Sequence, residues 1–506
     1  MTQEKDARYR MQDIRKGFTL VELLLVVGIL AVVFGLALPF ALNTKFTNEL
    51  DTATENLITT LREAQSQAIA AEGDTPHGVY FDTTATPPTY TIYRGASWAS
   101  RDTSFNAGGY GTTEFPKNVS LSTVSTIRDN EIFFSRLTGE ARTTSIKSVL
   151  KGMVAIPAGS GSVSVNMNPV DLNKSFLVFG TSFNDANPSF SQISGQITAP
   201  DTLTFTRQVA AGSPAINISW YVAEFSNGIV VQRGSTSFGL LTSVDATLTN
   251  AIDLTRSIPL ISFRKQGNNY DGNEFINAKL IDSTTLKLTL KNAPVNPNNM
   301  VEWQVIQFDR ASVQTGDISF LSSDTAITAP VTAVNAQKSW LLYSYKTNDG
   351  TISNIGQKLV QGRITNSANI TFNRDNTGSE NDLTWYLVEF KDGTNLQHNS
   401  LNFTAAESLK TATISAVDVS KALAVGGYMM KGGKSSYSTD DNPGAGWMML
   451  DITNSETLTV TRGANLGTAD IGWFVIDFNS RPAVITLSVP DIGTKEITVT
   501  AEGLIY

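Results

Sequence analysis

The sequence of 506 residues contains no cysteine and only two histidines. Without cysteine the chain can form no disulfide and has no thiolate for catalysis or metal binding. His77 and His398 lack the neighbouring residues that a catalytic triad or a zinc site requires. The sequence also contains no phosphate-binding loop and no dinucleotide-binding fingerprint. We therefore expect no catalytic residue, no metal, no cofactor and no enzymatic activity.

Charged residues are also scarce, at 17% of the chain. There are 38 basic and 46 acidic residues, which gives a formal net charge of −8. A nucleic-acid partner is not expected, because binding to phosphates depends on a basic surface. Threonine, serine, asparagine and glycine are frequent instead, as is typical of β-rich proteins of the cell surface.

One long apolar segment, residues 18–42, follows the basic pair Arg15 and Lys16. As an α-helix rising about 1.5 Å per residue it would span roughly 38 Å, which is enough to cross a bilayer. An ordinary signal peptide or membrane anchor would explain the apolar residues but not Glu22, the single charge in the segment. A carboxylate at this depth is costly and indicates a functional role.

The string from Gly17 to Glu22, Gly-Phe-Thr-Leu-Val-Glu, resembles the processing site of type IV prepilins and type II secretion pseudopilins. The resemblance implies that a prepilin peptidase cleaves between Gly17 and Phe18 and that Phe18 is then N-methylated. Residues 1–17 would be the leader peptide. Because this cut precedes the apolar segment, residues 18–42 would stay in the mature protein, unlike the apolar part of a secretory signal.

The same resemblance implies two successive locations for the apolar helix. It would first anchor the chain in the inner membrane as a single span, and then pack against other pilin subunits in an extracellular pilus or a periplasmic pseudopilus. Glu22 would pair with the terminal amine of a neighbouring subunit. Pro39 stands where these pilins often carry a proline, and we expect it to kink or loosen the helix.

A second helical pattern covers residues 46–72 and ends before Gly73. Its apolar positions fall on one face of a helix with a period of 3.6 residues: Leu50, Leu57, Leu61, Ala64 and Ala68. We assign residues 43–150 to the first part of a pilin head, in which this face packs on an antiparallel β-sheet. Strand-like runs follow at residues 78–81, 90–93, 119–121 and 131–135.

Residues 61–69 and 134–139 resemble the heads of minor pseudopilin H and of minor pilins. That family closes its head with two further strands, and residues 483–488 and 496–505 resemble them. The resemblance implies that residues 483–506 complete the head and that residues 151–482 are an insertion. The alternative is a pilin followed by a plain C-terminal extension.

The insertion contains an internal repeat. Four sequence blocks recur in one order, and the basic residues of the first block, Lys174, Arg256, Lys338 and Lys421, are 82, 82 and 83 residues apart. We expect four β-sandwich-like repeats, at residues 151–248, 249–331, 332–413 and 414–482. The last repeat lacks the fourth block. The alternative is one continuous β-solenoid or shared sheet.

A strand beginning with tryptophan is repeated in every unit, at Trp220, Trp303, Trp385 and Trp473. We expect one face of this strand to be core and the other to be partly covered, rather than forming a platform for stacking sugars. We also expect repeated arginines to pair with repeated acids across adjacent strands. The residues concerned are Arg207, Arg374 and Arg462, with Glu224, Glu389 and Asp477.

A polar turn follows the first block of each unit. The four turns lie at residues 184–187, 268–272, 348–350 and 439–442. Turn chemistry accounts for their composition, and calcium is the less favoured explanation because no regular spacing of aspartates recurs. Because each turn has the same place in its unit, the four could form one contact surface.

These observations predict an α+β protein in which a long N-terminal pilin helix packs on an antiparallel head that carries four β repeats. The function that we expect is that of a minor type IV pilin-like filament subunit whose insertion mediates adhesion, through a surface glycan or protein ligand. The alternatives are a minor pseudopilin of a type II secretion system and a pilus-borne enzyme acting on glycans. For such an enzyme, sequence alone cannot identify the pair of carboxylates.

Overall fold

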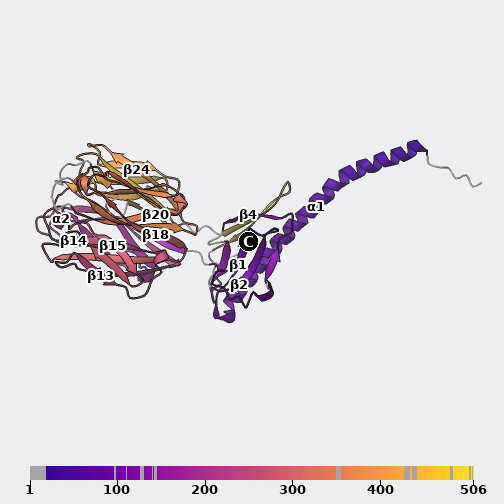
Figure 1. Ribbon diagram of the computed structural model, residues 1–506, viewed down its shortest axis with the longest axis horizontal. Helices are drawn as coiled ribbons and strands as arrows, with labels where there is room; N and C mark the ends of the chain where they lie inside the picture. Colours follow the sequence, from indigo (N-terminus) through magenta and orange to yellow (C-terminus); the bar gives the residue numbers. More distant parts are fainter. Residues whose placement is uncertain are drawn as a thin grey trace, which may run out of the picture.

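The computed structural model describes residues 19–95, 98–109, 111–125, 130–139, 141, 145–348, 355–426, 433–435, 442–478, 483–500, 503 and 505–506. A long helix leads into a small domain, and this domain carries a larger β-rich body (Figure 1). We call the small domain the N-terminal head (residues 46–141 and 483–506) and the larger body the repeat domain (residues 145–478).

The helix α1 (Leu20–Ile69) begins after Thr19 and is unbroken at Pro39, where a loosened stretch was expected. The predicted apolar face of its second half is confirmed, because all five of its residues are buried against the sheets of the head. The helix ends at Ile69, a few residues before the predicted Gly73. Gly73 lies in the following short helix η1 (Glu72–Asp74) with a φ of +66°, a conformation that glycine adopts without strain.

Two antiparallel sheets complete the N-terminal head. The first has the order β3-β2-β1-β5 and the second the order β32-β31-β4. Their strands are β1 (His77–Asp82), β2 (Thr89–Arg94), β3 (Thr112–Glu114), β4 (Ser120–Ser125), β5 (Glu131–Phe134), β31 (Ala483–Val489) and β32 (Gly493–Val499), with η2 (Ala107–Gly109) before β3. Since β31 pairs with both β4 and β32, the head is built from chain on both sides of the repeat domain.

The repeat domain begins with two units of six strands each. Unit 1 consists of β6 (Ser145–Ile156), β7 (Ser162–Asn166), β8 (Ser175–Ser182), β9 (Ile193–Ala199), β10 (Thr202–Arg207) and β11 (Ile216–Asn227), with η3 (Leu172–Lys174) and α2 (Pro188–Ser191). Unit 2 consists of β12 (Ile229–Thr236), β13 (Ser243–Thr247), β14 (Ser257–Lys265), β15 (Asn277–Asp282), β16 (Thr285–Thr289) and β17 (Asn299–Phe308), with η4 (Leu254–Arg256).

Two further units follow. Unit 3 consists of β18 (Ala311–Phe320), β19 (Ala326–Pro330), β20 (Ser339–Thr347), β21 (Gln361–Asn366), β22 (Asn369–Asn373) and β23 (Asn381–Phe390), with η5 (Ala336–Lys338) and η6 (Ile355–Gln357). Unit 4 consists of β24 (Asn395–Phe403), β25 (Leu409–Thr413), β26 (Ala422–Gly426), β27 (Gly433–Ser435), β28 (Met448–Asn454), β29 (Thr457–Arg462) and β30 (Ala469–Asp477), with η7 (Pro443–Ala445).

Each unit forms two separate antiparallel sheets, and strand pairing defines the units. In the first sheet the tryptophan strand lies in the centre, in the orders β6-β11-β8, β12-β17-β14, β18-β23-β20 and β24-β30-β26, with β27 also on β30. The second sheets have the orders β7-β10-β9, β13-β16-β15, β19-β22-β21 and β25-β29-β28.

This pairing places the unit boundaries earlier in the chain than the sequence blocks suggested. The fourth block, which begins at Val231 and Val313, lies in β12 and β18, and these are the first strands of units 2 and 3. The corresponding first strand of unit 4, β24, contains Leu396 and Gln397, so the last unit does not lack this block. The predicted boundaries differ because a repeat fixes the period but not the residue at which a unit begins.

The four units form a closed ring. Strands β9, β15, β21 and β28, at the edge of each second sheet, contact the first sheet of the next unit, and β28 of unit 4 contacts β8 and β11 of unit 1. Hydroxyl groups of the next unit accept hydrogen bonds from the N–H groups of these edge strands: Leu280 N donates to Tyr386 Oη at 2.8 Å, and Ile452 N donates to Tyr221 Oη at 2.9 Å. The ring thereby covers strand edges that would otherwise be exposed.

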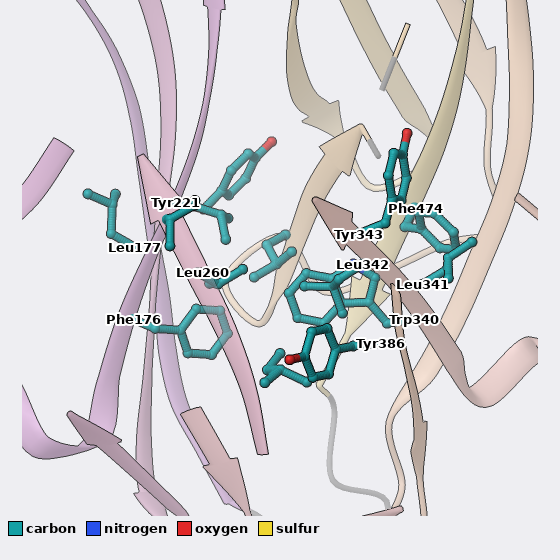
Figure 2. Packing of buried hydrophobic residues seen from close by; sticks show 14 of the residues in the cluster. Phe176, Leu177, Tyr221, Leu260, Trp340, Leu341, Leu342, Tyr343, Tyr386 and Phe474 are labelled. Atoms are coloured by element: carbon teal, nitrogen blue, oxygen red, sulfur yellow. The ribbon is translucent and has the colours of Figure 1, made fainter. Parts of the chain in front are cut away.

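Four equivalent phenylalanines confirm this closure at the centre. The ring centroids of Phe225 and Phe308 are 6.5 Å apart, those of Phe308 and Phe390 5.2 Å, those of Phe390 and Phe478 5.9 Å, and those of Phe478 and Phe225 5.2 Å. All four side chains are buried within one hydrophobic cluster that extends through all units. Part of this cluster is shown in Figure 2, where Phe176 and Tyr221 lie across the core from Trp340 and Phe474.

The two ends of the ring differ in what they contact. Phe225 lies near the end of β11 that pairs with the first residues of β6, where the chain enters from the head. Arg310, which follows Phe308, stacks over Phe133 of the head at 4.3 Å. At the opposite end, β8 finishes and leads to the first polar turn and α2, which lies far from the head in Figure 1. We call this opposite end the distal face.

Candidate functional site

The N-terminal end of α1 contains the predicted assembly residue Glu22. Its carboxylate accepts hydrogen bonds from the backbone N–H and the hydroxyl of Thr19, both at 2.9 Å, while the N–H of Glu22 donates to Thr19 Oγ1 at 3.2 Å. These contacts form a capping box that fixes the start of the helix. Gly17 and Phe18 lie outside the described residues, and for Pro39 only the helical backbone is described.

The rest of the chain does not cover the apolar side chains of α1 between Leu20 and Val33. The large apolar side chains in this stretch are between 44% and 75% exposed. A continuous apolar surface of this kind indicates contact with another protein or with a membrane. Within the described part of the chain, no helix meets the combined length and hydropathy required to span a membrane.

The predicted pairs between repeated arginines and repeated acids are wrong. Arg207 donates to the carbonyl oxygens of Pro214 and Ile156, and Arg374 and Arg462 likewise donate to backbone carbonyls around their strands. A guanidinium group carries five N–H donors and can therefore satisfy several buried carbonyls at once. These arginines are structural residues that close loops.

Two of the acids expected to pair with them cap a different element. Glu224 accepts a hydrogen bond from Asp171 N at 2.9 Å, and Glu389 accepts one from Asn335 N at 3.0 Å. Both bonds fix the chain just before the short helices η3 and η5. In unit 2 the amide of Gln307 makes the same contact with Asp253 N at 2.8 Å, so a neutral side chain can replace the acid.

Both faces of the tryptophan strands are buried, whereas one was expected to be only partly covered. The additional burial comes from the neighbouring unit, whose edge strand covers the second face. Trp220, Trp303, Trp385 and Trp473 are therefore core residues, with at most 7% of their surface exposed.

The polar turns that are described meet at the distal face. Asn442 of unit 4 donates a hydrogen bond to Asn184 of unit 1. Ser189, just after the turn of unit 1, donates through its N–H to Gly267 O of unit 2 at 3.2 Å. Lys358 of unit 3 donates to Tyr270 O of unit 2 at 2.6 Å. Chain segments of all four units thus contact one another at the end farthest from the head. Residues 349–350 and 439–441 of the predicted turns lie outside the described residues.

The two histidines occupy unlike surroundings. His77 is buried in the head, and burial lowers its pKa. Burial also lowers the pKa of His398 on β24, and a hydrogen bond to the backbone of Ala336 opposes this effect. Among the described residues there is no group of three or more histidines and acids that could hold a metal ion.

A cavity of about 440 Å³ lies at the seam between units 3 and 4. Its lining comes from β21, β24 and β30 and includes Arg363, Thr365, His398, Ser400, Trp473 and Phe474. Of these, the sequence analysis considered only His398 and Trp473. Alignment of the repeats with one another could have pointed to the site, because Ser400 stands where unit 3 has Asp317.

Comparison with known proteins identifies one family model. The model of the prokaryotic N-terminal methylation motif matches residues 14–38. A search of curated proteins finds no match. The matched segment contains the predicted cleavage site and Glu22, and the match indicates processing by a prepilin peptidase and assembly with other pilin subunits. These findings support a type IV pilin-like protein made as a prepilin-type precursor.

Proposed function

We propose that the protein is a minor type IV pilin-like subunit that presents its repeat domain for adhesion. The observation that carries this proposal is the opposite placement of two surfaces. The uncovered apolar face of α1 lies at one end of the molecule, and the polar distal face of the ring lies at the other (Figure 1). A subunit held in a filament by α1 would present the distal face outward.

In this proposal the helix has the successive roles described for prepilins. Residues 18–42 anchor the chain in the inner membrane, and after cleavage they pack against neighbouring subunits. The capping box supports the role of Glu22, because it fixes a carboxylate within one turn of the terminus that cleavage would create. The amine of a neighbouring Phe18 would pair with this carboxylate, and in an apolar filament core neither charge is stable alone.

We also propose that the repeat domain binds rather than catalyses. The support is that Glu224 and Glu302, buried acids of the tryptophan strands, already have partners. Glu224 accepts hydrogen bonds from Lys147 and from Asp171 N, each at 2.9 Å, and Glu302 accepts hydrogen bonds from Arg264 at 3.2 Å and from Ser235. The size of the repeat domain supports a minor subunit, since a domain larger than the head would crowd a thin filament if every subunit carried it.

The substitution Glu22→Ala tests the assembly role. We expect the variant to be processed and retained in the membrane, while its amount in sheared filaments falls by at least about tenfold, since the pairing charge is lost. Glu63→Ala is the matched control, because Glu63 is an exposed acid farther along the same helix. Immunoblots of filament and membrane fractions measure both variants.

Mass spectrometry of the native protein and immunogold labelling complete the test. We expect a mature N-terminus at methylated Phe18 and label on extracellular filaments. An unprocessed N-terminus would contradict the proposal. Correct processing with label confined to the periplasm would instead identify a pseudopilin of a secretion system.

A further inference from the structure

The cavity between units 3 and 4 differs from the other three seams of the ring in how its polar residues are paired. At the seam between units 4 and 1, Lys151 Nζ lies 3.0 Å from Asp451 Oδ1. At the seam between units 2 and 3, Lys279 forms an ion pair with Asp317. At the seam between units 1 and 2, Gln304 makes two hydrogen bonds with the backbone of Leu177, at 2.8 and 2.9 Å. At each of these seams a side chain of one unit bonds directly to the other unit, and the equivalent space between units 1 and 2 is only about 50 Å³.

At the seam between units 3 and 4, the residues at the corresponding positions do not form these contacts. Strand register aligns Arg363 with Lys279, and Ser400 with Asp317. Arg363 is thus a cation at the position of Lys279, but Ser400 has a hydroxyl group where Asp317 has a carboxylate. Among the described residues, no acid forms an ion pair with Arg363. Phe474 occupies the place of Gln304, Tyr386 and Tyr221, and cannot make their hydrogen bonds.

The space left by these replacements has the chemistry of a ligand site. Its volume of about 440 Å³ falls within the range of small-molecule pockets. The guanidinium of Arg363 can bind a carboxylate through two parallel hydrogen bonds. Thr365 and Ser400 offer hydroxyl groups, and Trp473 Nε1 is a buried donor without a partner. The apolar wall comes from Trp473 and Phe474.

We propose that this cavity binds an acidic sugar, a saccharide residue that carries a carboxylate. Arg363 binds the carboxylate, and Thr365 and Ser400 bind sugar hydroxyls. His398, held against Phe474 with ring centroids 5.7 Å apart, forms the side of the pocket. The inference rests on the proposed adhesive function and specifies one ligand class for it.

Isothermal titration of the full-length chain in detergent tests the site. The probes are galacturonic acid and N-acetylneuraminic acid, with galactose as the neutral counterpart and acetate as a carboxylate without a sugar. We expect binding of at least one acidic sugar, and affinity for galactose and acetate lower by on the order of tenfold or more, because a charge-assisted contact or the hydroxyl contacts are lost.

Three variants locate the binding. Arg363→Gln should reduce affinity for the acidic sugar by on the order of tenfold or more. Lys279→Gln, the same change at the equivalent position of unit 2, should leave affinity unchanged. Ser400→Asp restores the acid found at the seam between units 2 and 3, and it should abolish binding by pairing with Arg363. Thermal unfolding of each variant reports whether the fold is intact.

The proposal is overturned if neither acidic sugar binds, if acetate binds as tightly as the sugars, or if folded Arg363→Gln binds like the parent chain. Failure of the adhesive function is distinguished by a separate readout. Arg363→Gln should enter filaments normally, so an absence of the parent protein from filaments would contradict the filament role independently of sugar binding.

Discussion

Three repeated arginines, Arg207, Arg374 and Arg462, bind backbone carbonyls rather than the acids with which they were expected to pair. The sequence shows that these charges recur, but it does not show their partners, because backbone groups are present at every position. The apolar residues were predicted better. The five residues of the α1 face are buried as expected, since burial on a helix follows directly from spacing.

One buried ion pair in unit 2 provides a prediction at this scale. Lys265 and Glu274 form a salt bridge, with 2% and 0% of their side chains exposed. Replacing one partner leaves an uncompensated buried charge, so Lys265→Met should lower the free energy of unfolding by about 3–5 kcal/mol. Replacing both, with Lys265→Met and Glu274→Leu, should cost much less. Urea unfolding of the purified protein measures both changes.

The exposed pair of Lys279 and Asp317 is the control for this experiment. Lys279→Met should change the free energy of unfolding by less than about 1 kcal/mol, because solvent screens exposed charges. Equal costs for the buried and exposed pairs would contradict the assignment of Lys265 to the core.

At the scale of elements, strands were easier to predict than their grouping. The four tryptophan strands are the central strands of four sheets, and alternating apolar residues indicated them as strands. The unit boundaries could not be predicted from the sequence. In the sequence β12 and β18 directly follow the last strand of one unit, but they pair with strands of the next unit. Pairing over such separations leaves no local signal.

The contact of α1 with the head provides the prediction for this scale. Leu61 is completely buried between the helix and the sheets. Leu61→Ala should lower the free energy of unfolding of the head by about 2–5 kcal/mol, through lost burial and a residual cavity. Ile69→Ala, at a half-exposed position near the end of the same helix, should cost less than about 1 kcal/mol.

Hydrogen exchange of the intact chain shows which region of the protein the Leu61→Ala substitution destabilises. We expect faster exchange in β1 and β31 of the Leu61→Ala variant and unchanged exchange in the repeat domain, since the two regions have separate hydrophobic clusters. Faster exchange throughout the repeat domain would show that the clusters are not independent.

At the scale of the whole molecule, ring closure was beyond prediction. The repeats suggested either separate sandwiches or one continuous structure, whereas the described units keep separate sheets and share one core. Contact between the first and last units depends on the angle between successive units, and no motif in the sequence encodes that angle. The cavity at the seam of units 3 and 4 was missed for the same reason, because Arg363 and Ser400 meet only once the units are placed side by side.

Coupling between the first and last units tests the closed ring. Phe225 and Phe478 have ring centroids 5.2 Å apart. The double variant Phe225→Leu with Phe478→Leu should depart from additivity by about 0.5–3 kcal/mol, as contacting residues do. In an open array of units the two effects would simply add. Phe205 and Phe372, which lie in units 1 and 3, serve as the additive control.

The chain enters the ring at Ser145 and leaves it after Phe478, and both points lie at the end that faces the head. A tensile load on the distal face therefore divides between two covalent tethers that leave the ring together. The first strand, β6, and the strand before the exit, β30, are each held by backbone hydrogen bonds within their own units. Force drawn through a fibre would pull on both ends of the ring in parallel, and would not unzip it one unit at a time.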